Sequence, residues 1–161
     1  MAVLTLIADQ LTKVLALAHL TAGRPVDLVG SWLRLNLIRN SGAAFSLGDR
    51  ATWLLTLIAI GVLVAIGTMA RRLGSRPWAL ALGLILGGAL GNLADRFFRA
   101  PGPGRGQVVD FIDYFGLFIG NVADIAIVGA AASIAILSLR GVSASGEPGG
   151  RHTQETLEHK A

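Results

Sequence analysis

Long apolar runs separated by polar segments dominate the pattern of this chain. Four such runs, at residues 2–20, 51–70, 77–94 and 121–140, each approach the roughly 20 residues that a helix needs to cross a bilayer. The run at 51–70 contains no charged residue at all. The pattern therefore predicts four transmembrane helices within one domain, residues 1–140.

The first run differs from the others because it contains charged residues. It could be a cleaved signal peptide, but it has neither a basic start nor an uninterrupted apolar core. Asp9 and Lys13 lie four residues apart, on one helical face, with the acid nearer the N-terminus, which is the favourable order for an ion pair. The spacing leaves two interpretations open: a pair that only neutralises two costly charges, or one that also supports a site.

The segment between the first two runs has the period of a strand. Within residues 32–39, three leucines alternate with Arg34 and Asn36, which predicts one apolar face. A second short strand is expected at 44–47, after a turn at 40–42. Because the open edges of such a ribbon cannot cross lipid, we expect a small β-ribbon over residues 24–50 on the membrane surface.

The last two non-spanning segments are rich in glycine and proline. Pro101-Gly102-Pro103-Gly104 breaks any helix there, and residues 108–118 are apolar enough to lie in the membrane interface. We therefore predict an interfacial loop or helix over 97–119. Residues 141–161 combine Gly, Ser, Pro and charge, which predicts a disordered tail. The predicted fold class is an all-α membrane protein with a small β-ribbon.

Composition supports a membrane location and excludes several functions. The 161 residues are 53% hydrophobic and 15% charged, and the mean hydropathy is +0.62, more apolar surface than a soluble domain of this size can bury. No basic stripe interleaves with aromatics, which argues against nucleic-acid binding. The chain has no cysteine, and its histidines lack metal-ligand spacing, so we expect no metal site and no cofactor.

The charges also predict an orientation. Residues 71–76 contain three arginines and no acid, which favours the cytoplasmic side under the positive-inside rule. Four helices would then place both termini and the tail in the cytoplasm. The segments 24–50 and 97–119 would be extracytoplasmic.

Amides, an arginine and acids gather at the predicted outer ends of the third and fourth helices. Asn92 and Arg96 share one helical face, and so do Asn121 and Asp124, while Asp110 comes from the segment between them. Two carboxylates in one site resist joint ionisation, so one of them keeps a proton. The ionised member can then take a proton from water while the neutral member donates to a carbonyl oxygen, which is the chemistry of peptide hydrolysis.

Other interpretations of these acids stay open. For Asp95, beside Arg96 and Arg99, we predict a structural ion pair, and for Asp113 a surface role. For Asp110 and Asp124, residue type alone does not separate catalysis from pairing with a nearby arginine.

Two functions from other classes fit the sequence less well. A proton-coupled transporter or channel, with Asp9, Lys13 and Asp124 as a relay, would have acids facing one another near the midplane and usually an internal repeat. No repeat is visible, and Asp110 lies outside any predicted span. A membrane scaffold without activity would leave the clustered polar residues unexplained.

Five short motifs occur in order among the four predicted helices, and on them the chain resembles the lipoprotein signal peptidases, or signal peptidase II. These are bacterial inner-membrane aspartyl proteases that remove signal peptides from prolipoproteins. The family's patterns D-Q-x-[ST]-K, N-x-G-x-A-F, GGALGN-L-x-DR, VVDF and N-x-A-D match Asp9–Lys13, Asn40–Phe45, Gly87–Arg96, Val108–Phe111 and Asn121–Asp124. One departure is Gly120, where the family often has Phe.

The resemblance implies roles for nine residues. The catalytic aspartates would be Asp110 and Asp124; Asn40, Asn92, Arg96 and Asn121 would line the substrate site; and Asp9, Lys13 and Gly42 would support it. It implies cleavage just before a cysteine that carries diacylglycerol, near the outer face of the membrane, with the lipid in the bilayer. It also implies inhibition by globomycin, a substrate cradle at 32–47 and a lid at 97–119. We expect a monomer.

Overall fold

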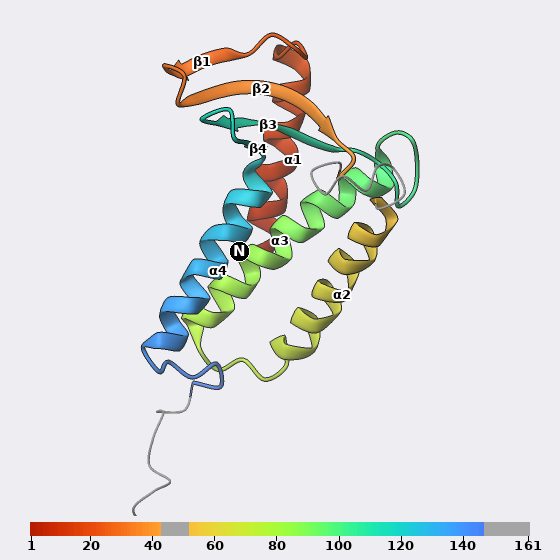
Figure 1. Cartoon of the computed structure of the whole chain (residues 1–161). Coiled ribbons are helices and arrows are strands. Elements are labelled where there is room, and N and C mark those ends of the chain that lie inside the picture. The colour runs from red at the N-terminus through yellow and green to blue at the C-terminus, as the bar shows by residue number, and fades with distance from the viewer. Residues whose placement is uncertain (43–51, 147–161) are drawn as a thin grey trace, which may run out of the picture.

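Four helices and a small sheet make up the computed structural model, which describes residues 1–42 and 52–146 (Figure 1). The helices are α1 (Ala2–His19), α2 (Thr52–Ala70), α3 (Arg76–Phe98) and α4 (Val122–Leu139). Each is long and apolar enough to cross a membrane, which confirms the four predicted spans. Helix α3 runs four residues past its predicted end, and the backbone leaves the helix only at Arg99, shortly before Pro101.

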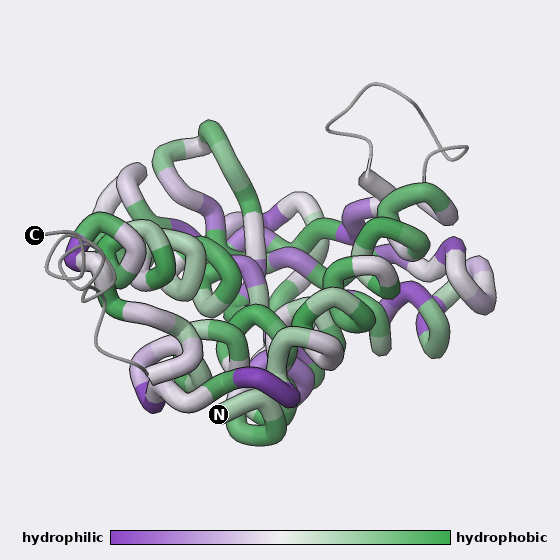
Figure 2. Tube along the Cα trace, turned by 90° about the horizontal axis from the view of Figure 1, so that it is seen from below, coloured by the Kyte–Doolittle hydropathy of each residue, from purple (hydrophilic) through white to green (hydrophobic). Residues whose placement is uncertain are grey.

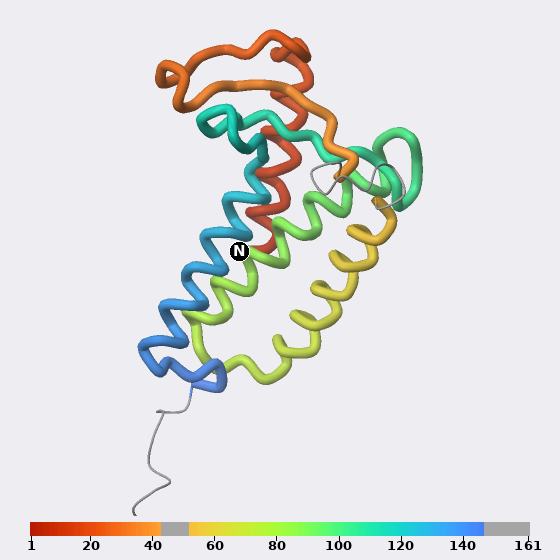
Figure 3. The backbone as a smooth tube through the Cα atoms, viewed as in Figure 1, coloured from red at the N-terminus to blue at the C-terminus, as the bar shows by residue number. Residues whose placement is uncertain are grey.

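Helix α3 packs against both α1 and α4, while α2 packs mainly against α3 and lies beside it away from α4 (Figure 3). Glycines on α3 make these contacts close. A Cβ on Gly87 would come within 2.5 Å of the Ala2 carbonyl oxygen, and one on Gly88 within 2.7 Å of the Ala123 carbonyl oxygen. The helices are hydrophobic over most of their length (Figure 2). Packing therefore rests on small residues, as expected where lipid competes with every apolar contact.

A four-stranded antiparallel sheet covers one end of the helices, with the strand order β1-β2-β3-β4. The strands are β1 (Val26–Val29), β2 (Leu33–Asn40), β3 (Val108–Tyr114) and β4 (Phe118–Gly120). The strand predicted within 32–39 is confirmed as β2. The strand predicted at 44–47 lies outside the described residues.

The sheet corrects two predictions. The described residues are not all-α, because four strands form a sheet, and residues 97–119 form no helix of their own: they contain the end of α3, a loop at 99–107, and then β3 and β4. The stretch 108–114 is rich in β-branched and aromatic residues, and pairing with β2 satisfies its backbone groups. That partner is more than 65 residues away in the sequence, so local pattern could not reveal it. A lid role for this segment stays a prediction.

The sheet is fixed to α1 by a small apolar core. Ala16 of α1 and Leu37, Val109 and Phe111 of the sheet are buried together. Since side chains alternate along a strand, Val109 and Phe111 face this core and Asp110 between them faces the opposite side. The core therefore determines which way Asp110 points.

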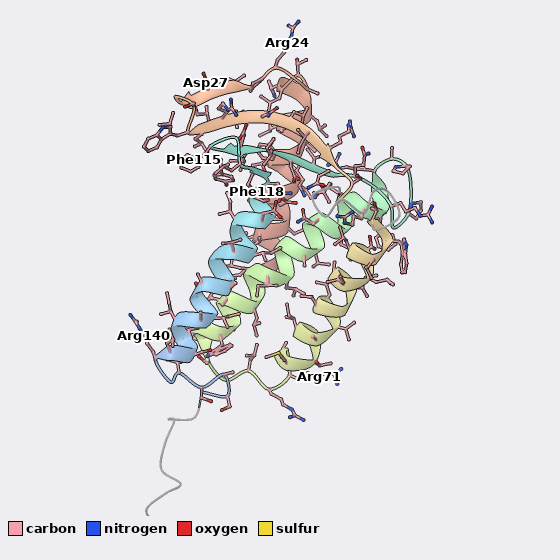
Figure 4. All side chains as sticks on the ribbon, in the orientation of Figure 1. Arg24, Asp27, Arg71, Phe115, Phe118 and Arg140 are labelled. Atoms are coloured by element: carbon pink, nitrogen blue, oxygen red, sulfur yellow. The ribbon has the colours of Figure 1, made fainter. Side chains whose placement is uncertain are left out.

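The other end of the helices carries basic residues and the start of the tail. Arg71 and Arg140 lie there, far from the sheet (Figure 4). The Trp78 indole N–H donates to the Val142 carbonyl at 2.8 Å, and the Gly74 N–H donates to the Ala144 carbonyl at 3.0 Å. Residues 141–146 are thus ordered against the start of α3, which corrects the prediction of disorder from 141. The rest of the tail lies outside the described residues.

Candidate active site

Asp124 is fixed by the way α4 begins. Asn121 is the N-cap: its side-chain oxygen accepts from the Asp124 N–H at 3.1 Å, and the Asp124 carboxylate accepts from the Asn121 N–H at 2.9 Å. This reciprocal capping box follows from the Asn-x-x-Asp spacing. The positive end of the helix dipole also favours the ionised carboxylate there.

Asp110 is held between two side-chain amides. Asn40, at the end of β2, donates to one of its oxygens at 2.8 Å, and Asn121 donates to the other at 2.6 Å. The Asn40 amide is itself oriented by the Gly42 N–H, which donates to its oxygen at 2.7 Å. Gly42 has a φ of +95°, a conformation that side chains other than glycine rarely adopt. Asn121 therefore connects Asp110 directly to the cap that holds Asp124.

Asn92 of α3 joins this pair to a buried lysine. The Lys13 ammonium donates to the Asn92 side-chain oxygen at 2.9 Å, and the Asn92 amide N–H donates to Asp124 at 3.1 Å. Because an ammonium can only donate, Lys13 fixes which end of the Asn92 amide faces Asp124. Asn121 donates to the same Asn92 oxygen at 3.1 Å. Each oxygen of Asp110 and Asp124 thus accepts one hydrogen bond from an oriented N–H group.

Lys13 also lies at the centre of a buried charge cluster. Its ammonium is 2.8 Å from a carboxylate oxygen of Asp9 and 2.8 Å from one of Asp95, and all three side chains are fully buried. Arg99 pairs with Asp95. The two carboxylates also accept from main-chain N–H groups, Asp9 from that of Ala123 and Asp95 from that of Val109. The negative charges of Asp9 and Asp95 balance the positive charges of Lys13 and Arg99, as a buried ionic cluster requires.

This cluster tests two predictions about ion pairs. The Asp9–Lys13 pair is confirmed. Asp95 forms the predicted structural pair with Arg99, but its second partner is Lys13 rather than Arg96. The Lys13–Asp95 contact was missed, since residues on separate helices carry no shared spacing. The cluster fixes α1 to α3 and to the start of α4, directly behind the two aspartates.

Arg96 lies beside the pair without a hydrogen bond to it. Its side chain is buried, and its charge acts on both Asp110 and Asp95. One terminal guanidinium nitrogen has no hydrogen-bond partner within residues 1–42 and 52–146. Its main-chain carbonyl accepts from the Gly106 N–H at 2.9 Å. Eight of the nine predicted site residues, including both aspartates, thus meet in one network of hydrogen bonds and ion pairs, and Arg96 stands at its edge.

The environment of Asp110 changes its proton affinity. Burial raises the pKa of Asp110 to about 6; the hydrogen bond from Asn40 opposes the rise, and the charge of Asp124 adds to it. A carboxyl group with such a pKa holds a proton at a pH where an ordinary aspartate has lost it.

Asp113 is not a surface residue, so that prediction is wrong. It is buried on β3, its carboxylate lies 2.8 Å from Arg34 of β2, and it also accepts from Asn36 and from the Gly116 N–H. Burial by itself raises the pKa of Asp113, but these hydrogen bonds and the charge of Arg34 outweigh it and hold the pKa below its usual value. Asp113 stabilises the sheet and lies outside the network of the two aspartates.

Within the described ranges, no group of His, Cys, Asp or Glu side chains is arranged to hold a metal ion. The arrangement instead offers two carboxylates with different surroundings, joined by one amide. One is buried and retains a proton readily, and the other is stabilised by a helix N-terminus.

Comparison with known proteins agrees with this arrangement. The family model of signal peptidase (SPase) II matches residues 1–140. The chain belongs to the signal peptidase II family. A lipoprotein signal peptidase of Mycobacterium tuberculosis is 55% identical over 140 residues, which cover 87% of this chain and 69% of that protein. One of Streptomyces griseus is 50% identical over 145 residues, covering 90% and 74%.

Two solved structures of bacterial membrane enzymes are also similar to this signal peptidase II family member. One has a TM-score of 0.74 and 28% identity and covers 86% of this chain and 90% of its own. The other has a TM-score of 0.71 and 28% identity and covers 93% and 92%. With its four membrane-capable helices, the protein is therefore a multi-pass membrane peptidase.

Proposed function

We propose that this protein is an aspartyl endopeptidase that cuts the signal peptide from bacterial prolipoproteins, just before the diacylglyceryl-modified cysteine. The observation that carries the proposal is the Asp110–Asn121–Asp124 link: one asparagine donates to the first carboxylate and caps the second. The family's relatives that are named lipoprotein signal peptidases support the substrate class.

One carboxylate would act as the general base and the other as the general acid. Asp124 accepts from the Asn92 and Asn121 N–H groups at the N-terminus of α4, and we assign it the part of general base. Asp110, whose pKa is raised to about 6, holds the proton. Each carboxylate oxygen can accept a further hydrogen bond, which leaves places for a water molecule and for the substrate.

The reaction then needs no covalent intermediate. Asp124 takes a proton from water as the water oxygen bonds to the scissile carbonyl carbon, and Asp110 gives its proton to the carbonyl oxygen. As the C–N bond breaks, the proton held by Asp124 passes to the nitrogen of the modified cysteine, and the hydroxyl on the carbon returns a proton to Asp110. The products are a signal peptide with a free carboxyl group and a lipidated cysteine with a free amine.

The remaining residues would position the substrate and the pair. Asn40, Asn92 and Asn121 orient the two carboxylates, and the Arg96 guanidinium beside them would donate to a substrate carbonyl group. Lys13, Asp9 and Gly42 act through these residues. We place the sheet and the two aspartates at the outer face of a bacterial inner membrane, with Arg71 and Arg140 on the cytoplasmic side. The proposed unit is a monomer, and globomycin is the expected inhibitor.

A defined substrate pair tests this function. We expect the purified protein, in detergent or lipid, to cut a diacylglyceryl-modified prolipoprotein once, directly before the modified cysteine, as read by mass spectrometry of both products. The same prolipoprotein without the lipid serves as the control and should be cut far more slowly. Cleavage at another bond, or equal cleavage of the two substrates, would contradict the proposal.

A further inference from the structure

The free end of the sheet extends beside the start of α4. The turn between β3 and β4 brings the chain back toward that helix, and Phe115 and Phe118 lie near the upper end of α4 (Figure 4). Both rings are exposed, as are Leu117 in the same turn and Trp32 of the neighbouring hairpin. This end of the sheet is therefore apolar, as expected for a surface that meets lipid rather than water.

A groove of about 420 Å³ lies between the sheet and α4. Two aromatic side chains from the sheet form one wall, and one face of α4 forms the other. The only charged group along it is the Asp124 carboxylate, at the end where α4 begins. The lining residues are Tyr114, Phe118, Asp124, Ile125, Val128 and Gly129.

The aromatic wall is held close to the carboxylate. The rings of Tyr114 and Phe118 stack with their centroids 6.2 Å apart and an angle of 19° between their planes. A Cβ on Gly120 would come within 2.7 Å of the Phe118 ring and 2.9 Å of an Asp124 oxygen. Glycine at position 120 lets the Phe118 ring and the Asp124 carboxylate lie this close to the backbone, and a larger residue would have to move one of them.

The groove opens toward lipid. Ile125 is 51% exposed and Val128 is 69% exposed, and both belong to a helix that is apolar enough to cross the membrane. A hydrocarbon chain can therefore enter sideways from the bilayer without meeting water. Another apolar pocket, between Leu15, His19 and Phe111, lies on the far side of β3 and reaches neither aspartate. The groove along α4 thus joins the exposed apolar surface of that helix to Asp124.

We propose that the groove between the Tyr114–Phe118 pair and the outer face of α4 binds an acyl chain of the diacylglyceryl group, with Phe118 as a specificity-determining residue. This inference rests on the proposed function, because it assigns a place to one part of that substrate. The geometry of the groove indicates its occupant. An apolar chain would enter from the bilayer, and the polar group to which that chain is attached would then lie beside Asp124. The cysteine thioether of the lipidated substrate has that position relative to the scissile bond.

Gly129 provides a test that leaves the fold intact. A Cβ at Gly129 would meet no atom within 4 Å, so Gly129→Phe adds a ring to the lining of the groove from an open position. Gly67→Phe is the matched control, since Gly67 of α2 is equally open and lies outside the groove. Wild type and both variants are compared on prolipoproteins whose diacylglyceryl groups have either long or very short acyl chains, at one detergent concentration.

We expect Gly129→Phe to lower kcat/KM for the long-chain substrate by about tenfold or more, the range of discrimination that a filled apolar pocket produces. Cleavage of the short-chain substrate should stay near the wild-type rate, and Gly67→Phe should match wild type on both. Unchanged long-chain cleavage by Gly129→Phe would overturn the assignment, and so would an equal loss on both substrates, which would place the peptide in the groove. If wild type cuts neither substrate, the proposed function itself fails.

Discussion

Asp110→Asn and Asp124→Asn are each expected to lower the rate of prolipoprotein cleavage by about a thousandfold, within the range that loss of a general acid or base produces. Asparagine keeps the shape of aspartate and one of its two acceptor oxygens, but it can neither accept nor supply the transferred proton. Asp124→Asn removes the group that takes the proton from water. Asp110→Asn removes the group that protonates the carbonyl oxygen.

The control for this pair is Asp27→Asn. Asp27 is an exposed acid on β1, so its replacement should leave the rate unchanged. All three variants should unfold at nearly the temperature of the wild type, which separates a loss of chemistry from a loss of structure. A variant of Asp110 or Asp124 that stays folded and keeps the wild-type rate would show that the two aspartates are not the catalytic pair.

Lys13→Met is expected to destabilise the protein by about 3–5 kcal/mol, the usual effect of breaking a buried ion pair. Methionine fills a similar volume but removes the one cation that contacts Asp9, Asp95 and Asn92 together. The cluster would then hold two buried carboxylates and only Arg99 as a positive partner. The measurement is the midpoint of thermal unfolding in detergent.

Two further variants show whether charge balance is the cause. Leu11→Met, on the exposed face of α1, should unfold like the wild type. Adding Asp9→Asn to Lys13→Met restores neutrality and should recover part of the lost stability, because an asparagine oxygen can still accept from the Ala123 N–H. If Lys13→Met alone unfolds at the wild-type midpoint, the buried cluster does not stabilise the fold.

The sequence predicts the helices well because their signal is local. Residues 51–70 are uncharged and apolar, so length and hydropathy alone identify a span, and the spacing of Asn121 and Asp124 already contains the capping box that the structure shows. The alternation within 32–39 likewise predicts β2. A relay of acids within the membrane finds less support, because Asp110 lies on a strand of the sheet rather than on a spanning helix.

The errors come from contacts between distant segments. Strand β3 pairs with β2 across more than 65 residues, so its apolar stretch looked like an interfacial segment, and Asp113 looked exposed because Arg34 is far away in the sequence. The Lys13–Asp95 contact and the place of Phe118 over Gly120 depend on how helices and strands meet in space. Contacts between residues far apart in the sequence produce no periodic pattern from which they could be predicted.

The most direct test of the account is whether Asp110 takes up a proton near pH 6 and whether that uptake depends on the charge of Asp124. Infrared difference spectra of the carboxylic acid band follow this without any substrate. Because the pKa of Asp110 is raised to about 6, a protonated carboxyl group should appear as the pH falls through that value, well above the range of ordinary aspartates.

The band should be missing near pH 6 in Asp110→Asn. In Asp124→Asn it should appear only at lower pH, because a neighbouring negative charge that raises the pKa of Asp110 is gone. A band near pH 6 that persists unchanged in Asp110→Asn, or one that does not respond to Asp124→Asn, would contradict the account.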